Sequence, residues 1–168
     1  MTIIHVDKII RNAKGDKPGL ADIHYEDDCF CCPMTVEFYS SLPKDERSLD
    51  VDIILYSYND YEVYKDEEEF INKKDNSMAP ESIIPIGNFQ IESGVFKKSS
   101  ENFINGKVLS VRENDEYYEV ELQCLNVIYY AYYHVGFGPK PEVGNIISSV
   151  YWTEIVVNDN SANQSRYS

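Results

Sequence analysis

The sequence lacks the short motifs that mark common catalytic sites. It has no Gly-x-Ser-x-Gly nucleophile motif, no His-Glu-x-x-His zinc motif, no P-loop and no Gly-x-Gly-x-x-Gly dinucleotide fingerprint. Gly136 and Gly138 reproduce only the first spacing of that fingerprint, and they lie in a segment rich in proline. The three histidines, His5, His24 and His134, belong to no motif. The sequence therefore leaves enzymatic activity uncertain and leans against it.

Basic residues are scarce. Lys and Arg number 15 against 29 Asp and Glu, the net charge is −14, and no run of basic residues exceeds two. Because binding to a phosphate backbone relies on clustered Lys and Arg, we expect no nucleic acid as a partner. A basic protein partner is a better match, since opposite charges speed encounter. Solubility alone also explains an acidic surface.

Long hydrophobic runs are missing as well. No apolar run approaches the roughly 20 residues that a membrane helix needs, and residues 1–7 are too quickly charged for a signal peptide. We therefore expect a cytoplasmic protein with no membrane partner. In that compartment the four cysteines should be reduced. The sequence gives no indication of oligomeric state.

Tyrosine, by contrast, is abundant, with 14 copies, and it favours strands. The clearest pattern lies in residues 106–153, where residues 117–124 alternate between polar and apolar side chains. This two-residue period is typical of a strand with one buried and one solvent-exposed face. The alternation changes phase after Cys124 and continues through residues 125–134. We interpret the phase change as a bulge or bend in one long strand, which helps a sheet to coil into a barrel.

Further strands are predicted over residues 2–10, 34–39 and 51–56. Residues 66–74 predict a short helix, because Asp66 and Glu69 have the spacing of a capping box. The pattern as a whole predicts an all-β or β-dominated fold with one short helix. Its antiparallel, coiled sheet would close into a partly open, OB-like barrel, and a β-sandwich is the alternative. We expect one β-rich domain over residues 1–157 and a disordered polar tail over residues 158–168.

One local feature is compatible with a metal site. Cys29, Cys31 and Cys32 lie close to His24, and thiolates and imidazoles are the usual zinc ligands. A second ligand pair downstream is missing, however, since Cys124 stands alone. Small residues in and around a strand explain the cluster more simply, because cysteine is readily buried. We expect no cofactor.

The aromatic residues near the C-terminus are the other candidate binding site. In the segment after Cys124, one alternating set of side chains should face the core, and the other should form an exposed strip, unless a loop or the helix covers it. Exposed aromatic strips are typical of interaction surfaces. The candidates are Tyr130, Tyr132, His134, Phe137, Tyr151 and Trp152. If the Trp152 indole lies in the core, Trp152→Ala should cost about 3 kcal/mol or more.

These observations favour an acidic, non-enzymatic binding protein that acts through protein–protein contacts. One version is an immunity-type inhibitor, which would neutralise a basic toxin through an acidic surface with embedded tyrosines. A β-barrel that binds a small ligand or a carbohydrate through the same aromatic residues is one alternative. A zinc-binding protein is another. No motif in the chain carries a resemblance to a known family.

Overall fold

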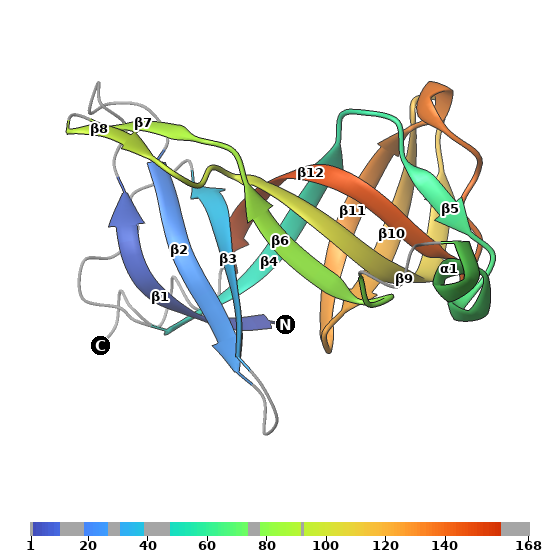
Figure 1. Ribbon diagram of the computed structural model, residues 1–168, viewed down its shortest axis with the longest axis horizontal. Helices are drawn as coiled ribbons and strands as arrows, with labels where there is room; N and C mark the ends of the chain where they lie inside the picture. Colours follow the sequence, from blue (N-terminus) through green and yellow to red (C-terminus); the bar gives the residue numbers. More distant parts are fainter. Residues whose placement is uncertain are drawn as a thin grey trace. The chain divides into compact units, whose positions relative to one another are not determined.

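The computed structural model describes residues 2–10, 19–26, 31–38, 48–73, 78–91 and 93–158. In these residues the chain is dominated by strands, with one short helix, as predicted (Figure 1). The elements are β1 (Thr2–Ile10), β2 (Gly19–Glu26), β3 (Cys31–Phe38), β4 (Ser48–Ser57), β5 (Glu62–Tyr64), α1 (Glu67–Lys73), β6 (Ser82–Ile86), β7 (Phe89–Ile91), β8 (Gly94–Phe96), β9 (Glu101–Glu113), β10 (Tyr117–Cys124), β11 (Val127–His134), the 3-10 turn η1 (Val135–Phe137) and β12 (Ile146–Val157).

Ten of the described strands share one sheet, in the order β5-β12-β3-β2-β1-β4-β11-β10-β9-β6. Further pairings of β12 with β4 and β9 complete a ring of eight hydrogen-bonded strands, which is not an even barrel. The predicted partly closed β sheet is therefore confirmed. The sheet is mixed rather than wholly antiparallel, because β4 with β11 and β3 with β12 run parallel. Strands β7 and β8 form a separate hairpin.

The chain divides into two compact units. The first comprises Met1–Ile53, Pro85–Glu101 and Thr153–Ser168, and the second comprises Ile54–Ile84 and Asn102–Trp152. The unit boundaries fall inside strands β4, β6, β9 and β12. One domain over residues 1–157 stays a prediction, and the tail predicted over residues 158–168 lies outside the described residues beyond Asn158.

The first unit is built on strands β1, β2 and β3, which lie side by side and run antiparallel (Figure 1). The start of β4 pairs with the other edge of β1. Burial alternates along part of these strands, whereas Leu20 and Ala21 of β2 and Met34 to Val36 of β3 are buried consecutively. Ile4, Leu20, Ile23 and Met34 are the largest side chains of β1, β2 and β3 with at most 1% of their surface exposed.

The second unit is built on the antiparallel strands β9, β10 and β11, with the end of β4 parallel to β11. Strands β10 and β11 are separate strands joined by a tight turn at Leu125 and Asn126, so the predicted bulge or bend is wrong. Both turn residues have positive φ, 52° and 67°. Such a two-residue turn matches the twist of a hairpin, and it shifts the alternation because the chain reverses there.

Helix α1 begins as its sequence predicts. Asp66 accepts a hydrogen bond from the backbone N–H of Glu69 at 2.9 Å, and the Glu69 carboxylate accepts one from the backbone N–H of Lys65. These bonds satisfy N–H groups that a helix start leaves open. Phe70 is the buried residue of the helix, and its ring meets that of Tyr64 edge-on at 5.0 Å.

A close approach between β9 and β10 requires glycine at position 106. A Cβ added there would lie 2.7 Å from Cγ of buried Leu122 and 3.1 Å from the carbonyl oxygen of Gln123. We expect Gly106→Ala to lower the free energy of unfolding by about 1–3 kcal/mol, because a packed core resists added volume. Urea unfolding measures this loss. Gly136→Ala is the matched control, since its nearest contact would be 3.4 Å, and an equal loss in both variants would contradict the steric explanation.

Candidate functional site

The candidate site lies on the outward face of β11 in the second unit. Tyr129 and Tyr133 are buried completely, at 0% exposure, whereas Tyr130 and Tyr132 are partly exposed and His134 is exposed. The alternation predicted from the sequence therefore divides the tyrosines into a core set and an outward set. The outward set has neighbours on both sides, because β11 lies between β4 and β10.

Two rows of side chains cross this outward face from β4 to β9. In the first row, Tyr132 stands opposite Tyr56 on β4 and Glu119 on β10. The rings of Tyr56 and Tyr132 stack, with centroids 5.6 Å apart and planes 21° apart. Arg112 on β9 ends the row, opposite Glu119.

The second row repeats the arrangement two residues along. Tyr130 stands opposite Ile54 on β4 and Glu121 on β10, and Ser110 on β9 ends the row. The two rows divide this surface into a mostly aromatic half, on β4 and β11, and a polar half, on β10 and β9. We call the whole surface the tyrosine–acid face. It consists of Ile54, Tyr56, Ser110, Arg112, Glu119, Glu121, Tyr130 and Tyr132.

A shallow cavity of about 210 Å³ lies in this face. Side chains from both rows line it, and Val120 and Ala131 lie between those rows on their strands. Sites for drug-sized ligands usually measure about 300–1,000 Å³. The cavity therefore suits a single side chain of a partner better than a whole small molecule.

The charge on the face is unbalanced. Within the described part of the chain, neither Glu119 nor Glu121 forms an ion pair. Arg112 stands opposite Glu119 and partly offsets its charge, whereas Ser110, opposite Glu121, carries no charge. Glu121 is also the more exposed of the two glutamates. The second row is thus the more attractive position for a cation.

His134 and Phe137 lie beyond the end of the two rows. The His134 ring contacts Tyr117 edge-on at 5.7 Å and Phe137 at 4.8 Å. Its Nδ1 accepts a hydrogen bond from the backbone N–H of Gly136 at 3.1 Å, which fixes the ring at the start of η1. Phe137 is 41% exposed, so this aromatic group extends the face along β11.

The other two aromatic candidates lie on β12, which contributes no residue to the face. Tyr151 is completely buried, and its hydroxyl shares a hydrogen bond with that of Tyr133. Trp152 is partly exposed. Its indole is therefore not a full core side chain, and the loss on Trp152→Ala should fall below that of a fully buried aromatic residue.

The metal candidates lie in the first unit. Cys29 falls outside the described residues, and of Cys31 and Cys32 only the strand positions at the start of β3 are described. His24 is held by Asp7, with its Nδ1 2.7 Å from a carboxylate oxygen, and it stacks on His5. Among the described side chains, no group of three His, Cys, Asp or Glu could hold a metal ion. The zinc site stays a prediction.

Six of the eight residues of the face were not identified as candidates from the sequence: Ile54, Tyr56, Ser110, Arg112, Glu119 and Glu121. The sequence predicts that Glu119 and Glu121 lie on the solvent-facing side of a strand. Their tyrosine neighbours follow only from the pairing of β10 with β11. Arg112 likewise becomes relevant only through its pairing with Glu119.

Comparison of the chain with protein-family models finds no match, and comparisons with curated proteins and with solved structures find none either. In the part of the chain that the structure describes, no helix has the length and apolar content needed to cross a membrane. The functional argument therefore depends on the geometry of the tyrosine–acid face.

Proposed function

We propose that this protein binds a basic protein partner, and that the tyrosine–acid face is the contact surface. The observation that carries the proposal is the pairing of two tyrosines on β11 with two glutamates on β10 that have no ion-pair partner among the described residues. Aromatic residues are enriched at protein interfaces, and a carboxylate beside them gives the surface a preference for positive charge.

The size and openness of the cavity support a protein over a small ligand. A cavity of about 210 Å³ accepts one inserted side chain, and the partly exposed tyrosines that line it offer contact area for the rest of a partner segment. Tyr56, at 39% exposure, continues this area onto β4. A carbohydrate would also stack on the rings and would donate hydroxyl hydrogen bonds to the carboxylates, but it has no positive charge to balance theirs.

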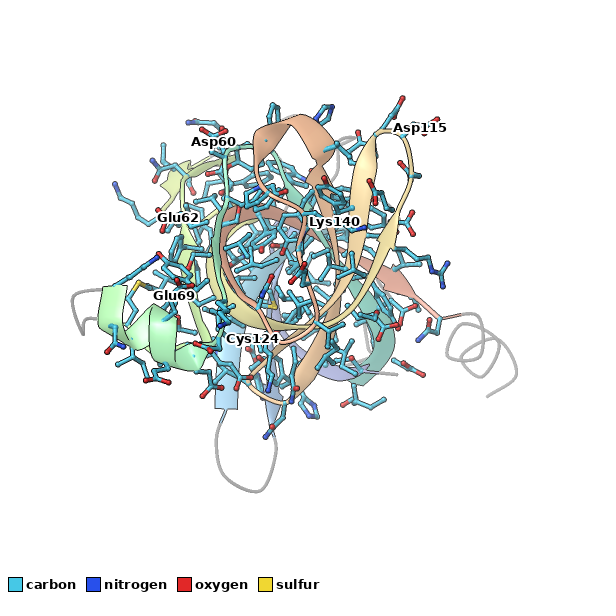
Figure 2. All side chains as sticks on the ribbon, turned by 90° about the vertical axis from the view of Figure 1, so that its right-hand side faces the viewer. Asp60, Glu62, Glu69, Asp115, Cys124 and Lys140 are labelled. Atoms are coloured by element: carbon cyan, nitrogen blue, oxygen red, sulfur yellow. The ribbon has the colours of Figure 1, made fainter. Side chains whose placement is uncertain are left out.

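The remaining acidic residues would act at long range. Figure 2 shows Asp60, Glu62 and Glu69 on one side of the second unit and Asp115 on the other, at the turn between β9 and β10. Charge spread in this way attracts a basic protein from many directions and speeds encounter. It does not select an orientation, so the specific contacts would come from the face. Inhibition of a basic toxin is one function that such binding would serve.

A matched pair of variants tests the proposal. Glu119→Gln with Glu121→Gln removes two charges from the face, and Glu67→Gln with Glu68→Gln removes two charges from exposed positions on α1. Both doubles have the same net charge, so only a local role of the face separates them. We expect proteins captured from host extract by the wild type to include a basic partner that the first double loses and the second keeps. Equal retention by both doubles would overturn the proposal.

A further inference from the structure

The two glutamates of the face differ in their surroundings, and that difference identifies a site for one kind of side chain. Glu121 faces Tyr130 on one side and the uncharged Ser110 on the other, whereas Glu119 faces Tyr132 and Arg112. We infer that Tyr130 and Glu121 bind an arginine side chain of the partner. This inference rests on the proposed function and specifies which chemical group the face recognises.

The geometry suits a guanidinium group in particular. Residues directly opposite each other on paired strands have Cβ atoms about 5 Å apart, and the side chains of Tyr130 and Glu121 line one cavity. Arg112 and Glu119, the other charged residues of its lining, stand opposite each other. A guanidinium is planar and can lie against an aromatic ring while it donates two N–H groups to a carboxylate. An ammonium group has the charge but not the plane, so lysine would use only part of the site.

The first row favours a different side chain of the same partner. Arg112 lies beside Glu119 and repels a second cation, while the stacked rings of Tyr56 and Tyr132 offer an apolar surface. The rows are two residues apart along the strands, which corresponds to about 7 Å, the same distance as between alternate side chains of an extended segment. The occupant is therefore an extended segment with arginine at one position and an apolar side chain two residues away.

Three short peptides test this arrangement on the full chain. The first is acetyl-Arg-Gly-Leu-amide. In the second, lysine replaces the arginine, and in the third, citrulline, the uncharged counterpart of arginine, replaces it. We expect the arginine peptide to shift the backbone amide signals of Glu121 and Tyr130 in NMR titrations. Binding of the lysine peptide should be roughly fivefold weaker, and that of the citrulline peptide roughly tenfold weaker or lost.

Single variants assign the effect to the second row. Glu121→Gln should weaken binding of the arginine peptide roughly tenfold, because it removes the carboxylate partner of the guanidinium. Glu119→Gln should weaken it less, and Glu67→Gln on α1 should leave it unchanged. The NMR spectrum of each variant also reports whether the fold is intact.

The outcomes separate this inference from the proposed function. Equal binding of the arginine and lysine peptides at the face would overturn arginine recognition and leave binding of a basic partner in place. If no peptide shifts these signals at millimolar concentration, while a captured basic protein still depends on Glu119 and Glu121, arginine recognition is again overturned. Shifts at the same residues with a neutral oligosaccharide, and none with the peptides, would overturn both.

Discussion

Replacing Tyr133 with alanine is expected to lower the free energy of unfolding by about 3–5 kcal/mol. Tyr133 has no exposed surface. Its ring packs against Tyr61, with centroids 4.7 Å apart, and against Tyr151 at 5.8 Å. The substitution leaves a cavity among these rings, and it removes the hydrogen-bond partner of the buried Tyr151 hydroxyl. Chemical unfolding of the variant and of the wild type gives the difference.

Tyr133→Phe separates the ring from the hydroxyl. Phenylalanine keeps the packing, so the expected loss is about 1–3 kcal/mol, the cost of leaving the Tyr151 hydroxyl without its buried partner. Trp152→Ala provides a comparison on β12, and its loss should be smaller than that of Tyr133→Ala because the indole is partly exposed. A loss below about 1 kcal/mol for Tyr133→Ala would contradict the position of Tyr133 in the core.

The strands of the second unit were the most predictable part of the fold. The two-residue alternation in residues 117–124 and 127–134 is clear, because each strand has one buried face and one outward face. The sequence did not predict the turn between these two strands, and the reason is local. Two-residue hairpin turns usually contain glycine or asparagine at both positions, and Leu125 takes the first position here with a φ of 52°. An apolar residue in that position looks like a continuation of the strand.

Strand β2 was not predicted from the sequence, for a different reason. Leu20, Ala21, Ile23 and Tyr25 are all buried, so apolar residues fall on both faces of the strand, and no clean alternation results. The acidic residues at its end, Glu26 among them, also resemble a loop. Parallel pairing of β4 with β11 could not be predicted either, because it joins strands that are distant in the sequence.

The candidate site was likewise predictable from the sequence only in part. The sequence predicts that one tyrosine set of β11 faces outward, and the structure identifies it as Tyr130 and Tyr132. What stands beside those rings depends on the register of three strand pairs. The register of β10 with β11 follows from the turn at Leu125 and Asn126, which the sequence did not reveal, and β11 pairs with β4 across a long stretch of sequence. A shift of one residue would turn Glu119 and Glu121 to the opposite face. The difference between the two rows, on which arginine recognition rests, is therefore a property of the folded chain.

High pH should destabilise this protein steeply through its buried tyrosines. Burial is the main cause that raises the pKa of Tyr133 well above the ordinary tyrosine value of 10.0, and the neighbouring Tyr151 adds to it. Burial likewise raises the pKa of Tyr151, and it raises that of Tyr61 to about 12. These phenols are protonated in both states below about pH 10, so they add no pH dependence there.

Above that pH, the unfolded chain loses these protons while the folded chain keeps them. Since the unfolded state then binds fewer protons, the free energy of unfolding falls as pH rises. Tyr133 and Tyr151 alone contribute a slope of about 3 kcal/mol per pH unit, and this slope persists until the folded-state pKa values are reached. Urea unfolding at a series of pH values from about 8 to 11 measures the slope, with tyrosinate absorbance as a second signal.

The double variant Tyr133→Phe with Tyr151→Phe is the control for this prediction. It removes both hydroxyls of the buried pair together, so neither is left without its partner, and the ring packing is retained. Its stability at neutral pH should therefore change little, while its slope above about pH 10 should be shallower by about two protons. Parallel slopes in the wild type and the double variant would mean that these two phenols are ionised as readily in the folded protein as in the unfolded chain, and that result would contradict the prediction.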